Sequence, residues 1–206
     1  MLIAARNGFL VGKPEDPSYP VDWIMGKPGV TIKEITITSA MLPLIWDAKT
    51  GFIVDLLTKN ASSGIQCNLL YKTWSGTGQF GLAVKYGNYS IQSGLPNYNQ
   101  LEFSRSNIAN TRTLIRYSAD GSIYLNDTLL GQTSKITPGS WTSSHPLYLL
   151  YSNSKRWIDP IYRFQITHDD IVQADFKPWC DYGIYGFKEL ISGEFFGNET
   201  LVGSDL

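Results

Sequence analysis

Apolar residues recur at every second position over long parts of the chain. The alternation is clearest in three runs: Phe52, Val54 and Leu56; Ile65, Cys67, Leu69 and Tyr71; and Phe80, Leu82, Val84 and Tyr86. Because successive side chains of a strand point to opposite faces, each run predicts a strand with one buried face. Residues 62–64 and 74–78, which separate the runs, are rich in Ser, Gly and Thr and are typical of turns.

Turn signals divide the second half of the chain in the same way. Asp120-Gly121 lies between two alternating segments and predicts a hairpin, because glycine accepts a positive φ. Asn126-Asp127 and Asp169-Asp170 are further turn candidates. Helical spacing never persists, and its best candidate, residues 40–49, contains Pro43. The pattern therefore predicts an all-β protein, an antiparallel two-sheet sandwich of roughly a dozen short strands with hardly any helix.

Residues 1–30 differ from the rest, because prolines at 14, 17, 20 and 28 prevent a helix and interrupt strands. The same stretch is too apolar for a solvated linker, since it carries Phe9, Leu10, Trp23 and Ile24. We expect an extended Pro-rich arm over residues 1–30 and a β-sandwich domain over 31–206. The arm either packs on a neighbouring molecule as an assembly element or packs back on its own sandwich, and the sequence does not separate the two.

Composition narrows the range of functions. The 206 residues favour one domain, and 17 Lys and Arg against 18 Asp and Glu form no basic stripe, so the sequence predicts no nucleic-acid partner. No apolar run reaches the roughly 18 residues of a membrane span, which predicts no membrane insertion. The first twelve residues are a poor secretory signal, because polar residues break their apolar stretch.

Four short motifs follow one another in the last third of the chain. They are residues 160–166 (PIYRFQI), 172–178 (VQADFKP), 183–187 (GIYGF) and 193–197 (GEFFG). In this order they resemble the end of phage-encoded concanavalin A-like (laminin-G-like) domains, and the hairpin region 113–130 is similar to the middle of that family. The resemblance runs from about Val30 to the end. It implies a concanavalin A-like jelly roll and says little about chemistry. Because Pro178 cannot donate to a ladder, we expect it to end an edge strand.

Folds related to this one include glycoside hydrolases, which place two acids about 5–10 Å apart across the sugar. The nearest pairs here are Glu15-Asp16, Asp169-Asp170, and Glu189 with Glu194. The first two are adjacent, so on a strand their side chains would face opposite ways. The hydrolases' E-x-D-x-x-E arrangement is absent, and His145 and His168 are both best interpreted as turn residues. The sequence therefore predicts no enzyme and no catalytic residues.

Metal and redox chemistry are equally poorly supported. Cys67 and Cys180 with two distant histidines make no zinc pattern, and a buried free thiol is the interpretation preferred over a disulfide. Calcium would need six to eight converging oxygens. Asn126-Asp127 and Asp169-Asp170 are the candidates for such a site, but ordinary turn chemistry is favoured at both. We expect no cofactor and no metal site.

Sugar binding needs exposed aromatic rings with amides or hydroxyls beside them. Several aromatic residues lie in polar loops or beside turns, as a glycan-binding surface requires. The candidates are Trp74, Tyr86, Asn88, Tyr89, Tyr98, Trp141 and Trp157. The competing interpretation is that a chain with 6 Trp, 12 Tyr and 9 Phe leaves several rings partly exposed in any case.

These observations favour a non-enzymatic bacteriophage virion structural protein, a capsid decoration, head fibre or tail component with a lectin-like domain. Its expected partners are other virion proteins or copies of itself, together with host-surface or mucosal glycans, and its expected location is the virion. One alternative is a secreted carbohydrate-binding module at the surface of a bacterium. The other is a glycoside hydrolase, which the missing acid pair disfavours.

Overall fold

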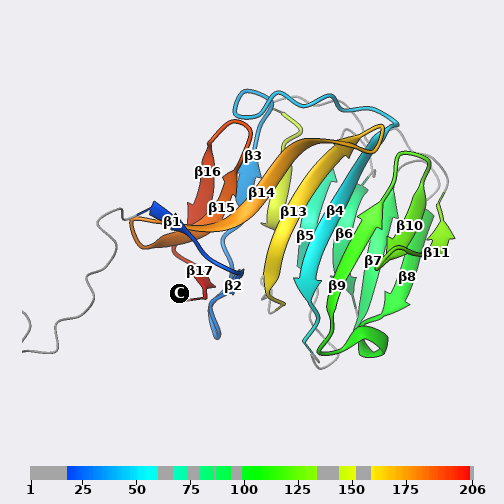
Figure 1. Ribbon diagram of the computed structural model, residues 1–206, viewed down its shortest axis with the longest axis horizontal. Coiled ribbons are helices and arrows are strands. Elements are labelled where there is room, and N and C mark those ends of the chain that lie inside the picture. The colour runs from blue at the N-terminus through cyan, green and yellow to red at the C-terminus, as the bar shows by residue number, and fades with distance from the viewer. Residues whose placement is uncertain are drawn as a thin grey trace, which may run out of the picture.

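The computed structural model contains two antiparallel β-sheets (Figure 1). It describes residues 18–59, 67–73, 79–85, 87–93, 99–133, 144–151 and 159–204. Within these residues the only helix is one turn of 3-10 helix, η2 (Arg105–Ile108). The prediction of an all-β protein with two antiparallel sheets is therefore confirmed.

The first sheet has 11 strands. Eight of them follow one another in the order β11 (Thr128–Gln132), β10 (Ser122–Leu125), β9 (Arg112–Tyr117), β4 (Thr50–Leu57), β13 (Ile161–His168), β14 (Ile171–Asp181), β15 (Ile184–Glu189) and β16 (Phe195–Asn198). Three short strands lie off this path: β1 (Ser18–Pro20) pairs with β14, while β2 (Ile24–Gly26) pairs with β13 and with β17 (Leu201–Gly203).

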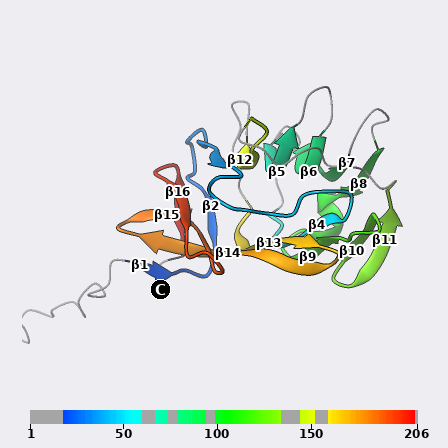
Figure 2. The ribbon, with the colours of Figure 1, turned by 90° about the horizontal axis from the view of Figure 1, so that it is seen from above.

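The second sheet has six strands and forms the opposite layer (Figure 2). Their order is β3 (Ile35–Ile37), β12 (Leu147–Tyr151), β5 (Cys67–Thr73), β6 (Gln79–Lys85), β7 (Asn88–Ser93) and β8 (Asn99–Ser104). The chain passes repeatedly between the layers, so β3 and β12 meet in the second sheet while β4 and β13 meet in the first.

The alternating apolar positions form the core between the sheets. Phe52, Val54 and Leu56 of β4 are fully buried, and so are Leu82 and Ile91 of the second sheet, in one continuous cluster. Each side chain of this size contributes roughly 1.5–3 kcal/mol when it leaves water. The thiol of Cys180 also lies buried and free, as predicted. Nothing is described for the side chain of Cys67.

Turn chemistry defines the hairpins as the sequence predicts. Both residues of Asn126-Asp127 and of Asp169-Asp170 have positive φ, between 47° and 64°, and each pair joins two strands in a tight turn of the primed type. Gly121 has φ +86° and closes the turn between β9 and β10 by donating its N–H to the Ser118 carbonyl at 2.9 Å. The proposed need for a positive φ at Gly121 is thus confirmed.

Pro178 does not end an edge strand, and that expectation is wrong. It lies inside β14, opposite Phe187 of β15. On its other side β14 pairs with β13 as far as Phe176 and with β1 from Trp179 onward. The Pro178 carbonyl accepts a hydrogen bond from Val21 N at 3.2 Å on that side. Because N–H and C=O of one residue in an antiparallel strand point the same way, the missing N–H faces the gap between β13 and β1, where no strand needs it.

The described part of the Pro-rich segment, residues 18–30, is built into the first sheet. Tyr19 lies opposite Cys180 of β14, and Ile24 lies opposite Ile161 of β13. Ile24 is fully buried in its own core, so of the two alternatives for this residue the structure supports packing back on its own sandwich. Trp23 is half-buried, and Phe9 and Leu10 lie outside the described residues.

The first half of β14 forms an edge of the first sheet, because its pairing with β15 begins only at Phe176. Gln173 is an extra residue there, since Val172 faces Thr167 and Ala174 faces Ile166. Its side-chain amide accepts from Ile45 N at 2.9 Å and donates to Ile45 O at 2.8 Å. The amide thus makes the two bonds that the backbone of a neighbouring strand would make.

Candidate functional site

Most of the aromatic residues proposed for sugar binding lie outside the described residues: Trp74, Tyr86, Tyr98, Trp141 and Trp157. Asn88 is half-buried at the start of β7, and its Nδ2 donates to Glu102 Oε2 at 3.3 Å. Tyr89 is fully buried and cannot present its ring to a sugar, so the prediction for Tyr89 is wrong. Tyr89 is buried although it lies next to a turn, because its ring packs among apolar side chains and its hydroxyl has a buried hydrogen-bond partner.

The partner of Tyr89 is a buried ion pair that joins the two sheets. Arg105 Nη2 contacts Asp159 Oδ1 at 2.6 Å and Oδ2 at 2.5 Å, and the Tyr89 hydroxyl donates to Oδ2 at 2.6 Å. The Lys59 N–H donates to Asp159 Oδ1 at 2.8 Å. Burial, together with the negative charge of Asp159, raises the pKa of Tyr89 well above its usual value, so the phenol stays protonated. This network lies inside the sandwich and has a structural role.

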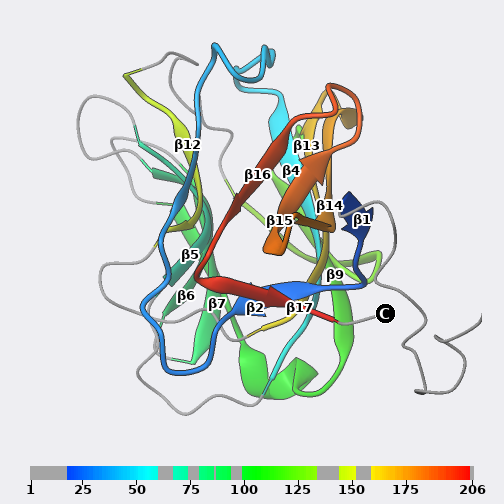
Figure 3. The same ribbon diagram turned by 90° about the vertical axis from the view of Figure 1, so that its left-hand side faces the viewer.

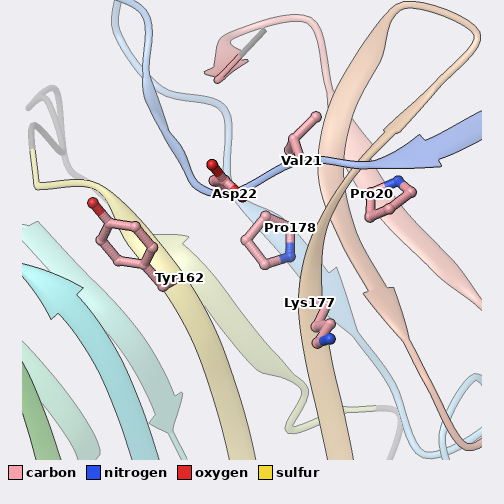
Figure 4. Close-up of a pocket in the computed structure, with 6 residues that line it drawn as sticks. All are labelled: Pro20, Val21, Asp22, Tyr162, Lys177 and Pro178. Atoms are coloured by element: carbon pink, nitrogen blue, oxygen red, sulfur yellow. The ribbon is translucent and has the colours of Figure 1, made fainter. Parts of the chain in front are cut away.

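An open cleft of about 220 Å³ lies on the outer side of the first sheet, where β14 changes partner (Figure 4). Three segments far apart in sequence surround it: the connection from β1 to β2, the start of β13, and the middle of β14. The lining residues are Pro20, Val21, Asp22, Tyr162, Lys177 and Pro178.

Two backbone irregularities create this cleft. In β13 the register shifts between Ile161 and Arg163, so Tyr162 is an extra residue that β4 does not match. Such a bulge re-aims a side chain, and here it directs Tyr162 to the outer face. In β14, Pro178 sits at the gap between β13 and β1. The cleft is therefore a consequence of the bulge and the proline together.

Arg112 holds the ring of Tyr162 in place. Its guanidinium carbon lies 4.0 Å from the ring centroid, a cation–π contact. The same guanidinium binds Asp55 through two hydrogen bonds, of 2.9 Å from Nε to Oδ1 and 2.7 Å from Nη2 to Oδ2. The hydrogen bonds to Asp55 are the main reason that the pKa of Arg112 is raised, and the nearby charge of Asp22 adds to the effect. The ring is thus positioned before any ligand arrives.

The polar groups of the cleft are a carboxylate, an ammonium and a phenol. The Asp22 backbone N–H donates to Ser204 Oγ at 2.8 Å, which fixes the residue on the wall of the cleft. Lys177 is exposed and forms no ion pair with any residue that the structure describes. A ligand with hydroxyl groups would meet an acceptor at Asp22, a donor at Lys177 and an aromatic ring at Tyr162.

Asp169, Asp170 and Glu189 are used in local structure, while Glu15 and Asp16 lie outside the described residues. Asp169 Oδ2 lies 2.7 Å from Lys49 Nζ, and Asp170 Oδ1 accepts from Ala119 N at 3.1 Å. Glu189 is buried and accepts hydrogen bonds from three backbone N–H groups. Burial opposes its ionisation, but these bonds outweigh burial, so the pKa of Glu189 lies below its usual value. His168 Nε2 lies 3.1 Å from both carboxylate oxygens of Asp47.

The calcium candidates also take part in turns. Asn126 Oδ1 accepts from Leu114 N at 2.8 Å, which leaves this oxygen committed to its own hairpin. Across the described ranges, no cluster of three or more His, Cys, Asp or Glu side chains is placed to hold a metal ion. His145 lies in an isolated bridge before β12, with Ser144 Oγ 3.2 Å from its Nδ1.

Sequence reasoning missed the residues of the cleft. Tyr162, Lys177 and Pro178 lie within the motifs 160–166 and 172–178, which the sequence assigns to the fold alone. In the sequence Tyr162 alternates regularly with Phe164 and Ile166, so the bulge that turns it outward left no signal there. Nothing in the sequence around Asp22 points to a binding site.

Comparison with protein-family models gives no matching family, and comparison with curated proteins gives no significant relative. In the part of the chain that the structure describes, no helix is long and apolar enough to cross a membrane.

Proposed function

We propose that this chain is a non-enzymatic, glycan-binding structural protein of a bacteriophage virion, built on a concanavalin A-like jelly roll. The cleft beside Pro178 carries the proposal, because it combines a fixed aromatic ring with a carboxylate and an ammonium on an open surface. Sugars offer an apolar ring face and many hydroxyls, and sites that bind them supply aromatic surface with a few placed polar groups. The cleft serves binding without bond cleavage.

The finer fold assignment rests on the order of the strands. β3 pairs with β12 and β4 pairs with β13, while two meanders, β5–β8 and β9–β11, lie between them in sequence. This nesting of early strands against late ones supports a jelly roll. The four C-terminal motifs support the phage-encoded laminin-G-like group. Other virion proteins, or further copies of this chain, are the protein partners that the proposal implies.

A glycan array followed by titration calorimetry tests the function. Tyr162→Ala is expected to weaken binding of any glycan that the protein retains by about tenfold, which corresponds to ~1.4 kcal/mol. Tyr124→Ala is the matched control, since Tyr124 lies on β10 under the guanidinium of Arg116, at 3.9 Å, in the same kind of contact but away from the cleft. Its affinity should equal that of the unmodified protein.

Two outcomes contradict the proposal. One is that no bacterial or mucosal glycan is retained by a protein whose circular dichroism shows it to be folded. The other is that Tyr124→Ala and Tyr162→Ala weaken binding equally, which would move the binding site away from the cleft.

A further inference from the structure

The outer face of the first sheet continues from the cleft onto β15. Lys177 of β14 lies directly opposite Lys188 of β15, and Trp179 lies opposite Gly186 two register positions further along the same strands. The side chains of Lys177 and Trp179 point away from the core, because Phe176, Pro178 and Cys180, which alternate with them, are buried. Lys177 therefore belongs both to the cleft and to this face.

Two lysines in directly opposite positions repel each other, and like charges placed this way destabilise a sheet. Neither ammonium has an acidic partner among the described residues. The Lys188 Nζ lies 4.3 Å from the centroid of the Trp179 ring, which holds it on the surface of the sheet. Trp179 is itself anchored, since its Nε1 donates to Ser18 Oγ at 2.8 Å. The two lysines therefore start from directly opposite positions of neighbouring strands, and the ammonium of Lys188 is held over the Trp179 ring.

Two arginines of this face are already paired with acids. Arg112 is bound by Asp55, and Arg163 is bound by Asp175 through two hydrogen bonds. Asp22 and Asp181 are the remaining acids nearby, on the far wall of the cleft and at the end of β14. A ligand that fits this distribution carries one negative group for the lysine pair and hydroxyl donors for Asp22.

We infer that the ligand is an acidic glycan, whose sugar carboxylate binds between Lys177 and Lys188 while its hydroxyls reach Asp22 across the cleft. This inference rests on the proposed glycan binding and specifies its substrate class. Each ammonium–carboxylate contact is a charge-assisted hydrogen bond, and such bonds are about twice as strong as neutral ones. The ring of Trp179 carries the Lys188 ammonium over its face and so fixes one side of the carboxylate site.

Binding to polygalacturonate, a polymer of carboxylated sugars, is the direct test. We expect measurable affinity by titration calorimetry, and affinity lower by about tenfold or more for fully methyl-esterified polygalacturonate, which keeps the hydroxyls and loses the charge. Lys177→Ala and Lys188→Ala should each weaken binding of the acidic polymer about five- to tenfold. Lys33→Ala removes the same charge from an exposed lysine near the weakly paired Glu199, and it should change nothing.

The outcomes separate this inference from the proposed function. Equal binding of the acidic and esterified polymers, with no effect of either lysine variant, would overturn the acidic ligand and keep glycan binding. In a second outcome, dextran sulfate or single-stranded DNA binds as tightly as polygalacturonate, and Lys33→Ala weakens binding as much as the other lysine variants. This outcome would show a generic response to polyanions and would also overturn the acidic-glycan inference. A protein that retains no glycan of any kind overturns both proposals.

Discussion

Asp159 is the buried acid of the network between the two sheets. Its carboxylate is 1% exposed and accepts hydrogen bonds from Arg105, Tyr89 and the Lys59 backbone. Arg105 is 5% exposed, and its Nε has no hydrogen-bond partner among the described residues. Removing one member of a buried ion pair leaves the other charge uncompensated, and this is the costly change.

Asp159→Asn should therefore lower the free energy of unfolding by about 3–5 kcal/mol. The measurement is the urea midpoint followed by tryptophan fluorescence. Asp169→Asn is the matched control, because Asp169 pairs with Lys49 on the surface and its positive φ of 53° suits asparagine. Its midpoint should barely move. Equal losses in the two variants would show that the Arg105–Asp159 pair adds nothing specific to stability.

Gly121 is held by two separate constraints. Its φ of +86° is strained for a branched side chain, and a Cβ there would lie 2.5 Å from the Thr133 carbonyl oxygen. Gly121→Val should cost more than about 1 kcal/mol of unfolding free energy. Gly29→Val isolates the first constraint, because Gly29 has φ +84° and nothing within 4 Å of its Cβ position. If thermal melting shows that both variants lose the same stability, the contact with Thr133 does not contribute to the cost at Gly121.

At the scale of elements, the sequence predicts the strands whose apolar residues alternate or that are bounded by turn residues. β4 carries three buried residues at alternate positions, and the Asn126-Asp127 and Asp169-Asp170 turns define their hairpins by backbone geometry alone. β1 and β2 carry no such mark, since they are three residues long and lie among prolines. Their strand conformation is imposed by β14, β13 and β17, which supply the hydrogen-bond partners. The sequence predicts a strand end at Pro178, where β14 in fact continues to Asp181, because sequence does not show which side of a strand lacks a neighbour.

Truncation distinguishes the two roles considered for the first thirty residues. A chain that starts at residue 29 loses β1 and β2, and with them the fully buried Ile24 and the nearly buried Val21. Each such side chain contributes roughly 1.5–3 kcal/mol, so this chain should unfold at much lower temperature or aggregate. A chain that starts at Ser18 keeps both strands and should melt close to the full chain. Circular dichroism melting with size-exclusion chromatography measures both. A stable fold in the shorter chain would mean that β1 and β2 are accessory.

At the scale of the whole molecule, the end of the sandwich near β16 is tied across the two sheets (Figure 3). Asn198 Nδ2 donates to Lys33 O at 2.8 Å, and Lys33 N donates to Thr200 Oγ1 at 3.0 Å, just before β3 begins. The segments that meet in this way are more than 160 residues apart in sequence. The candidate cleft has the same origin, because Asp22, Tyr162 and Lys177 come together only through the order of strands. Strand order is a property of the fold that alternation along one sequence does not encode, and for this reason the composition of the site was not predicted.

The Gln173 amide bonds to the Ile45 backbone at the edge of β14, and this contact limits strand pairing between molecules. A bare sheet edge is a template on which any other extended chain can grow a further strand. Here a side chain and the Ile45 backbone satisfy each other, and the extra residue at Gln173 bends the strand away from a regular ladder. At high local concentration, this edge should therefore not pair with a strand of another copy. The molecules should remain separate instead of forming a common sheet.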